Sequence, residues 1–75
     1  MVMIEVRLFA GLREGRQKVY QMEAGSISTI QDVMDVLQIP RSEVNIMLIN
    51  GFHKEPLSPV QDKDIVALFP AVGGG

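Results

Sequence analysis

Hydrophobic and polar positions alternate along residues 2–9. Four aliphatic residues fall on one face of an extended segment at this spacing: Val2, Ile4, Val6 and Leu8. A period of two over eight residues predicts a β-strand with one buried face. Residues 18–22 predict a second, weaker strand, and their charged and amide side chains are typical of a sheet edge. The glycine-containing segment between the two is expected to join them as a hairpin.

One amphipathic helix is predicted in the middle of the chain. Its apolar residues recur at the spacing of a single helical face: Ile30, Val33, Met34 and Leu37. Ser28 and Gln31 have the spacing of a capping box, so we expect the helix to be capped at Ser28. Pro40 should end it at or before Ile39. Such a helix must pack its apolar face against another layer.

Three further strands are predicted after the helix. Residues 44–49 form β-prone sequence, and Asn50-Gly51 favours a tight turn into a short return strand at residues 52–53. Residues 65–69 form the last strand, which Pro70 ends. The order predicts an α+β domain over residues 1–69, of the β-grasp (ubiquitin-like) type, with a mixed four- to five-stranded sheet. The first and last strands should be its central pair, and residues 70–75 an extended tail.

A sheet with a single helix has one covered face and one open face. If Val6 faces the helix, alternation turns Phe9 away from it, and the same counting places Ile46 and Leu48 in the core. The open face is then predicted to carry these apolar residues: Phe9, Met47, Ile49, Ala67 and Phe69. We interpret this patch as a partner surface. The alternative is that loops cover it, or that it is ordinary scattered apolar surface.

The composition excludes several kinds of chemistry. The 75 residues suffice for one small domain, and 47% of them are hydrophobic, as in a folded protein. Because there is no cysteine, disulfides, thiolate metal sites and thiol nucleophiles are excluded. The net charge of -2 gives no indication of the positively charged surface that binding to nucleic acid or to an anionic membrane requires. Without an apolar span or a signal-peptide core, the chain is expected in the cytoplasm.

The last six residues, Pro70 to Gly75, have no evident structural use. Three terminal glycines lose the most entropy on ordering, but a thread without side chains can enter a narrow channel. The α-carboxyl of Gly75, with a pKa of roughly 3.3–3.7, is an unreactive anion at neutral pH. It would need activation by another protein, most plausibly as an acyl-adenylate made with ATP. The chain has no phosphate-binding loop of its own, and we expect it to bind neither cofactor nor metal.

Three segments together carry a family resemblance. They are Phe-Ala-Gly-Leu-Arg-Glu at residues 9–14, Asn50-Gly51, and Asp-Ile-Val-Ala-Leu-Phe-Pro at residues 64–70 leading to a Gly-Gly terminus. In this order they resemble the MoaD/ThiS sulfur-carrier family over nearly the whole chain. Within it, the first segment is most similar to the small subunit of molybdopterin synthase.

The resemblance implies a function for the tail. An E1-like adenylyltransferase would adenylate Gly75, and a sulfur donor system would convert it to a thiocarboxylate. The tail would then enter the large subunit of molybdopterin synthase, which uses the sulfur to build molybdopterin. Gly74 and Gly75 match the active terminus of the family, and Phe9, Arg13 and Phe69 match positions near its partner surface. With the open face and tail, the candidate partner contacts are Phe9, Arg13, Met47, Phe69, Val72 and Gly73.

Two departures leave alternatives open. Ala71 and Gly73 stand where the family more often has proline and a residue with a side chain. The sulfur acceptor could therefore belong to thiamine thiazole, cysteine or tungsten cofactor synthesis instead. A ubiquitin-like protein modifier and a β-grasp interaction module with an irrelevant tail are further alternatives. We expect no catalysis by the chain alone, because no nucleophile, base and orienting residue stand together.

Overall fold

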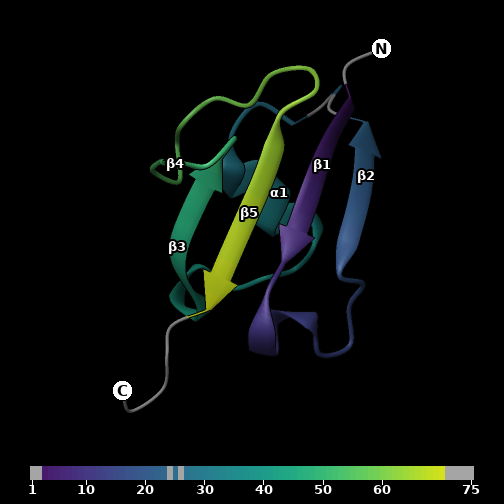
Figure 1. The fold of residues 1–75 in the computed structure, drawn as a ribbon, viewed down its shortest axis with the longest axis vertical. Coiled ribbons are helices and arrows are strands. Elements are labelled where there is room, and N and C mark those ends of the chain that lie inside the picture. The colour runs from purple at the N-terminus through teal and green to yellow at the C-terminus, as the bar shows by residue number, and fades with distance from the viewer. Residues whose placement is uncertain (1–2, 24, 26, 71–75) are drawn as a thin grey trace.

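Five strands form one mixed sheet, and one α-helix lies across one of its faces (Figure 1). The computed structural model describes residues 3–23, 25 and 27–70. Its elements are β1 (Met3–Leu8), β2 (Val19–Glu23), α1 (Ile30–Val36), β3 (Val44–Ile49), β4 (Phe52–His53) and β5 (Ile65–Pro70), with 3-10 turns η1 (Ala10–Arg13) and η2 (Arg41–Glu43). The predicted element order and β-grasp architecture are confirmed.

The two central strands are β1 and β5, which run parallel. Val6 lies beside Val66 and Leu8 beside Leu68. Antiparallel β2 flanks β1, antiparallel β3 flanks β5, and the strand order is β2-β1-β5-β3-β4. The first and last strands therefore form the centre and β2 an edge, as the sequence predicted. Asn50 and Gly51 both have positive φ, at 53° and 87°, as the predicted turn requires.

The hydrophobic core lies between the sheet and α1. Its fully buried members come from both central strands, η1 and the helix: Ile4, Val6, Leu8, Leu12, Ile30, Val33, Met34, Val66 and Leu68. Leu37 packs against this cluster from the end of the helix. The predicted apolar face of the helix is thus the buried one. Each such side chain contributes about 1.5–3 kcal/mol on burial, so the sheet and helix stabilise each other.

The helix begins one residue later than predicted. Thr29 is its N-cap: the Thr29 hydroxyl accepts from the Asp32 N–H at 3.2 Å, and the Asp32 carboxylate accepts from the Thr29 N–H at 3.1 Å. The predicted pairing of Ser28 with Gln31 is wrong. Thr29 forms a β-bridge with Pro59 and has extended backbone angles, so the helix cannot start before it.

The side chains of strand β3 point to the opposite faces of the sheet from those predicted. Met47 and Ile49 are buried, with only 3% and 6% exposure, whereas Ile46 and Leu48 are half-buried on the other face. The cause is a register shift between Val44 and Ile46, opposite Pro70 and Phe69 of β5. One extra residue in a strand turns every later side chain to the other face. The expectation that Met47 and Ile49 lie on the open face is therefore wrong.

Truncating Met47 tests this facing. Met47→Ala should lower the free energy of unfolding by about 2–5 kcal/mol, because it removes buried volume from the core. Leu48→Ala, the matched change one residue later, should lose less than half as much, because Leu48 is partly exposed. Urea unfolding of both variants checks the comparison. A larger loss for Leu48→Ala would contradict the observed register.

Removing the hydroxyl of the helix cap provides a second test. Thr29→Ala should lower the free energy of unfolding by about 1 kcal/mol, because the Asp32 N–H loses its acceptor. Ser28→Ala should change it by less than about 0.5 kcal/mol, since the exposed Ser28 side chain caps nothing. Thermal unfolding of the two variants measures both changes. Equal losses would place the cap elsewhere.

Candidate functional site

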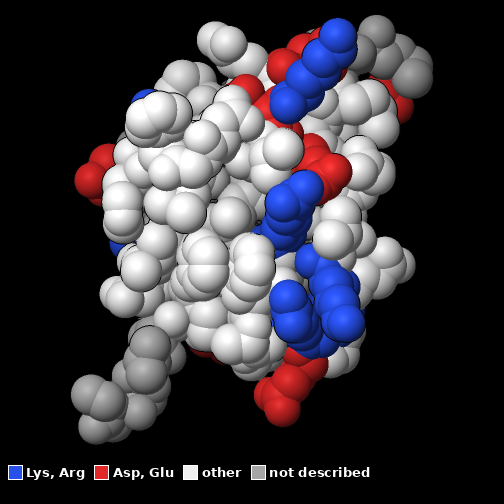
Figure 2. Space-filling view, viewed as in Figure 1, with Lys and Arg blue, Asp and Glu red and all other residues white. Residues whose placement is uncertain are grey.

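The sheet face that turns away from α1 is the candidate site. In the view of Figure 1 the helix lies behind the sheet, so Figure 2 displays this open face. Uncharged residues cover most of the area over β3 and β5, and basic side chains gather over β1 and the segment that follows it (Figure 2). Its half-buried apolar residues come from β3, from β5 and from the residue after β1: Phe9, Ile46, Leu48, Ile65, Ala67 and Phe69.

Two stacked aromatic rings form one end of the open face. The centroids of Phe9 and Phe69 are 4.3 Å apart, and the rings are within 8° of parallel. The Cζ atom of Arg13 lies 5.4 Å from the centroid of Phe9, within the range of a cation–π contact. The stack holds Phe9, which directly follows β1, against Phe69, which precedes Pro70 at the end of β5.

The backbone after β1 places Arg13 over this stack. Phe9 donates its N–H to the carbonyl of Leu68 at 3.2 Å, and the 3-10 turn η1 then reverses the chain. Leu12 anchors the turn in the core with 1% exposure. The Arg13 Nε donates to the carbonyl of Leu8 at 2.8 Å. This hydrogen bond to the Leu8 carbonyl holds the Arg13 guanidinium at the edge of the open face.

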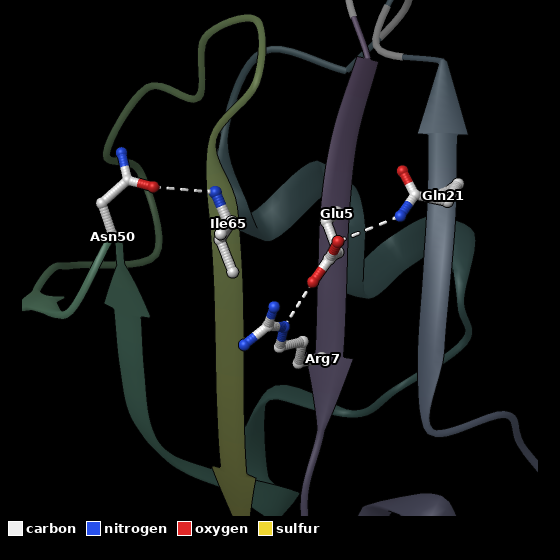
Figure 3. Close-up of polar contacts among 5 residues, drawn as sticks. All are labelled: Glu5, Arg7, Gln21, Asn50 and Ile65. Carbon is white, nitrogen blue, oxygen red and sulfur yellow. Dashed lines mark hydrogen bonds and ion pairs between the residues drawn. The ribbon is translucent and has the colours of Figure 1, made fainter.

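Polar contacts frame the opposite end and one flank of the face (Figure 3). The Asn50 side chain accepts from the Ile65 N–H at 3.0 Å and joins the β3–β4 turn to the start of β5. On β1, Glu5 forms an ion pair with Arg7 and accepts from Gln21 of β2 at 3.0 Å. The Arg7 contact, followed by that of Gln21, lowers the pKa of the Glu5 carboxyl, because both contacts stabilise its charged form.

The structure brings together three of the six predicted partner contacts. Phe9, Arg13 and Phe69 meet at one end of the open face, as predicted for the two aromatics. Met47 is in the core and contributes no surface there. Val72 and Gly73, like the predicted reactive Gly74 and Gly75, lie outside the described residues. The last described residue, Pro70, pairs with Val44 directly after the aromatic stack.

Sequence reasoning placed two apolar residues of this face, Ile46 and Leu48, in the core, and it did not propose Arg7 as a contact. Leu48 occupies the position expected for Met47, and Arg7 stands between the apolar area and the β1–β2 flank. The alternation of β1 already turns Arg7 away from the core, so its position could have been predicted from the strand pattern. Leu48 could not, because the register shift that exposes it has no marker in the sequence of β3.

Within the described part of the chain, no three side chains of His, Asp or Glu are grouped so that they could hold a metal ion. No helix of the described residues has the length and apolar character needed to cross a membrane. The open face of the described residues is largely apolar, with basic side chains along one flank.

Several solved structures share the fold of this chain, among them the following three. SAMP1, small archaeal modifier protein 1, from Haloferax volcanii is 24% identical, with a TM-score of 0.75, over 97% of this chain and 99% of that chain. A putative molybdopterin converting factor, subunit 1, from Pyrococcus furiosus is 20% identical, with a TM-score of 0.75, over 96% and 100%. A chain in the complex of subunits 1 and 2 of molybdopterin-converting factor from Helicobacter pylori is 24% identical, with a TM-score of 0.68, over 99% and 100%.

Two comparisons of the sequence with known proteins bear on the family of this chain. A search of curated protein sequences finds no significant match. The model of the ThiS family, in contrast, matches residues 6–75, which include every element except the first residues of β1. Because that match spans nearly the whole sequence, the chain belongs to the ThiS family, and the resemblance to the MoaD/ThiS sulfur carriers is confirmed.

Proposed function

We propose that this chain is a sulfur carrier whose C-terminal glycine, Gly75, is converted to a thiocarboxylate. The observation that carries the proposal is the extent of the family match, which runs through the Gly-Gly terminus. The fold supports it, because β5 ends beside an open apolar face and leads directly into the tail sequence. A partner that docks on this face therefore meets the root of the tail.

The chemistry requires an activating enzyme. A carboxylate resists nucleophilic attack, so the proposed first step joins the Gly75 carboxylate to AMP and releases pyrophosphate from ATP. Hydrosulfide delivered by the donor system then attacks the acyl carbon. The C–S bond forms as the C–O bond to AMP breaks, and the products are a thiocarboxylate and AMP. ATP is bound by the E1-like adenylyltransferase in this scheme, and the carrier supplies only the terminus and a docking surface.

For the acceptor we propose the large subunit of molybdopterin synthase, which would use the sulfur to build the dithiolene of molybdopterin. Two observations support this choice. The segment Phe9 to Glu14 matches the synthase branch of the family, and the fold is shared with a subunit of the Helicobacter pylori complex. In this assignment the chain is the sulfur-donating subunit of a two-component enzyme.

A protein modifier is the second candidate, because the fold is also shared with small archaeal modifier protein 1. A modifier would use the same activated Gly75 but transfer it to a lysine amine. The two functions differ in product: a thiocarboxylate in one case and an isopeptide-linked adduct in the other. Immunoblots of the tagged chain from its own cells distinguish them, since ladders of larger adducts are expected only for the modifier.

Deletion of Gly75 tests the proposed function. The variant should lose sulfur transfer at least about 100-fold, because its carboxylate ends one residue, or about 3.5 Å, short of the reacting position. Its midpoint of thermal unfolding should be unchanged, since no core residue is altered. The measurement is thiocarboxylate and molybdopterin formation with the adenylyltransferase, ATP, a sulfur donor and the large subunit.

Gly25→Ala is the control for this assay. A methyl group at Gly25 meets no atom within 4 Å, so this variant should transfer sulfur like the wild type. Sulfur transfer by the deletion variant at the wild-type rate would overturn the proposed function. Thiocarboxylate formation without molybdopterin would retain the carrier function and overturn the proposed acceptor.

A further inference from the structure

Strand β2 forms an open edge of the sheet. It is the last strand on its side and pairs only with β1, so no other described strand lies along its outer side (Figure 1). It runs for five residues, Val19–Glu23, without proline or glycine. The strand at the opposite edge, β4, has only the two residues Phe52–His53. The longer of the two edges is therefore β2.

The hydrogen bonds of β1 show which backbone groups of β2 point outward. The Lys18 carbonyl accepts from the Leu8 N–H at 2.9 Å, so Lys18 and every second residue after it turn toward β1. Glu5 agrees with this alternation, because its N–H donates away from β2, to the Asp64 carbonyl at 3.0 Å. Among the described residues, no hydrogen bond is formed to the outward N–H and C=O groups. These groups belong to Val19, Gln21 and Glu23.

Apolar side chains lie on both sides of this edge. Val19 is 43% exposed on the open face, and Val36 of α1 is 57% exposed on the helix side. Val36 lines a recess together with Tyr20 and Leu37, which are half-buried. An unpaired strand with exposed apolar neighbours is the arrangement that favours pairing with a further strand.

The two ends of β2 carry opposite charges. Lys18 directly precedes the strand, Glu23 is its last residue, and both are exposed. A second copy of β2 running antiparallel would bring the basic end of one strand to the acidic end of the other, at both ends of the pair. Charged side chains at a sheet edge usually repel further strands, but this pattern attracts its own antiparallel copy. Charge complementarity therefore selects a second copy of the chain as the occupant of this edge.

We propose that two copies of this chain pair edge to edge through β2, antiparallel, around a two-fold axis at Gln21. In this register Gln21 faces Gln21 of the second copy, and Val19 faces Glu23 of the second copy. All three outward residues of each strand are then bonded to those of the other, and the contact is the same for both copies. The two sheets become one sheet of ten strands, five from each copy.

The same register pairs apolar side chains on the helix side of the sheet. Tyr20 lies opposite Met22 of the second copy, and both side chains are half-buried in the separate chain. The flexible Met22 side chain of the second copy is thereby placed beside the recess that Tyr20 and Val36 line. Burial of this apolar surface adds to the backbone hydrogen bonds of the strand pair.

This inference goes beyond the proposed function and does not depend on it. Strand β1 separates β2 from β5, so the pairing involves neither β5 nor the sequence after it. Under the proposed function, each dimer would carry two reactive termini. The assembly itself can be measured without any sulfur chemistry.

Sedimentation equilibrium tests the pairing. One strand pair makes a small interface, so we expect a reversible wild-type dimer with a dissociation constant on the order of 100 μM. Gln21→Pro should weaken the dimer at least about 30-fold, because it removes the outward N–H at the axis and leaves the bonds to β1 intact. His53→Pro is the matched control on the opposite edge and should associate within about twofold of wild type. The His53 N–H also points outward, because the next residue, Lys54, donates its N–H inward to the Met47 carbonyl.

Charge reversal tests the antiparallel register. Lys18→Glu and Glu23→Lys should each weaken the dimer about tenfold at low ionic strength, because each sets like charges beside one another at both ends of the pair. An equimolar mixture of the two variants should dimerise at least as well as the wild type, since the mixed pair again brings opposite charges together. Added salt should reduce all of these differences.

Circular dichroism and thermal unfolding check that each variant is folded, and the charge variants keep the test open if Gln21→Pro does not fold. A wild-type chain that stays monomeric up to about 1 mM would overturn the proposal. A dimer that Gln21→Pro and both single charge reversals leave intact would also overturn it, since another surface would then hold the copies together. A mixture of the two charge variants that associates no better than either alone would contradict the antiparallel pairing.

Discussion

A single helical layer on a five-stranded sheet is the constraint from which the rest of this structure follows. The parallel pair β1–β5 supplies Val6, Leu8, Val66 and Leu68 to the core, and α1 covers them from one side only. Because side chains alternate along a strand, burying these residues turns Arg7, Ala67 and Phe69 to the uncovered side. The fold therefore produces its own contact surface, and the strand that carries it leads into the C-terminal sequence.

Much of this arrangement could be predicted from periodicity. The period-two pattern of β1, the helical spacing from Ile30 to Leu37 and the Asn50-Gly51 turn each gave the element that the structure contains. Element order was then enough for the β-grasp architecture, since few topologies accommodate it. The positions of Phe9 and Phe69 on the open face followed from the facing of their own strands.

Two errors came from interactions between segments distant in sequence. The helix cap is Thr29 and not the predicted Ser28, because Thr29 pairs with Pro59 and this pairing holds the backbone extended there. Met47 lies in the core and not on the predicted open face, because β3 contains one extra residue opposite Pro70 and Phe69. Neither pairing has a local marker in the sequence. The second error matters for function, because it replaced Leu48 by Met47 in the predicted contact surface.

Under the proposed function, the open face gives a carrier of this size a surface that its activating enzyme can recognise. The aromatic stack and the basic side chains lie near the end of β5, so the proposed docking surface adjoins the start of the C-terminal tail sequence. Both steps of the proposed chemistry then belong to partner proteins.

The most direct test of this account is the mass of the C-terminal peptide of the chain purified from its own cells. We predict that one oxygen of the Gly75 carboxylate is replaced by sulfur, and that fragmentation places the added mass on that residue. A terminus that remains an unmodified carboxylate after incubation with ATP, the adenylyltransferase and a sulfur donor would contradict the account. That result would instead support the alternative of a β-grasp interaction module with an irrelevant tail.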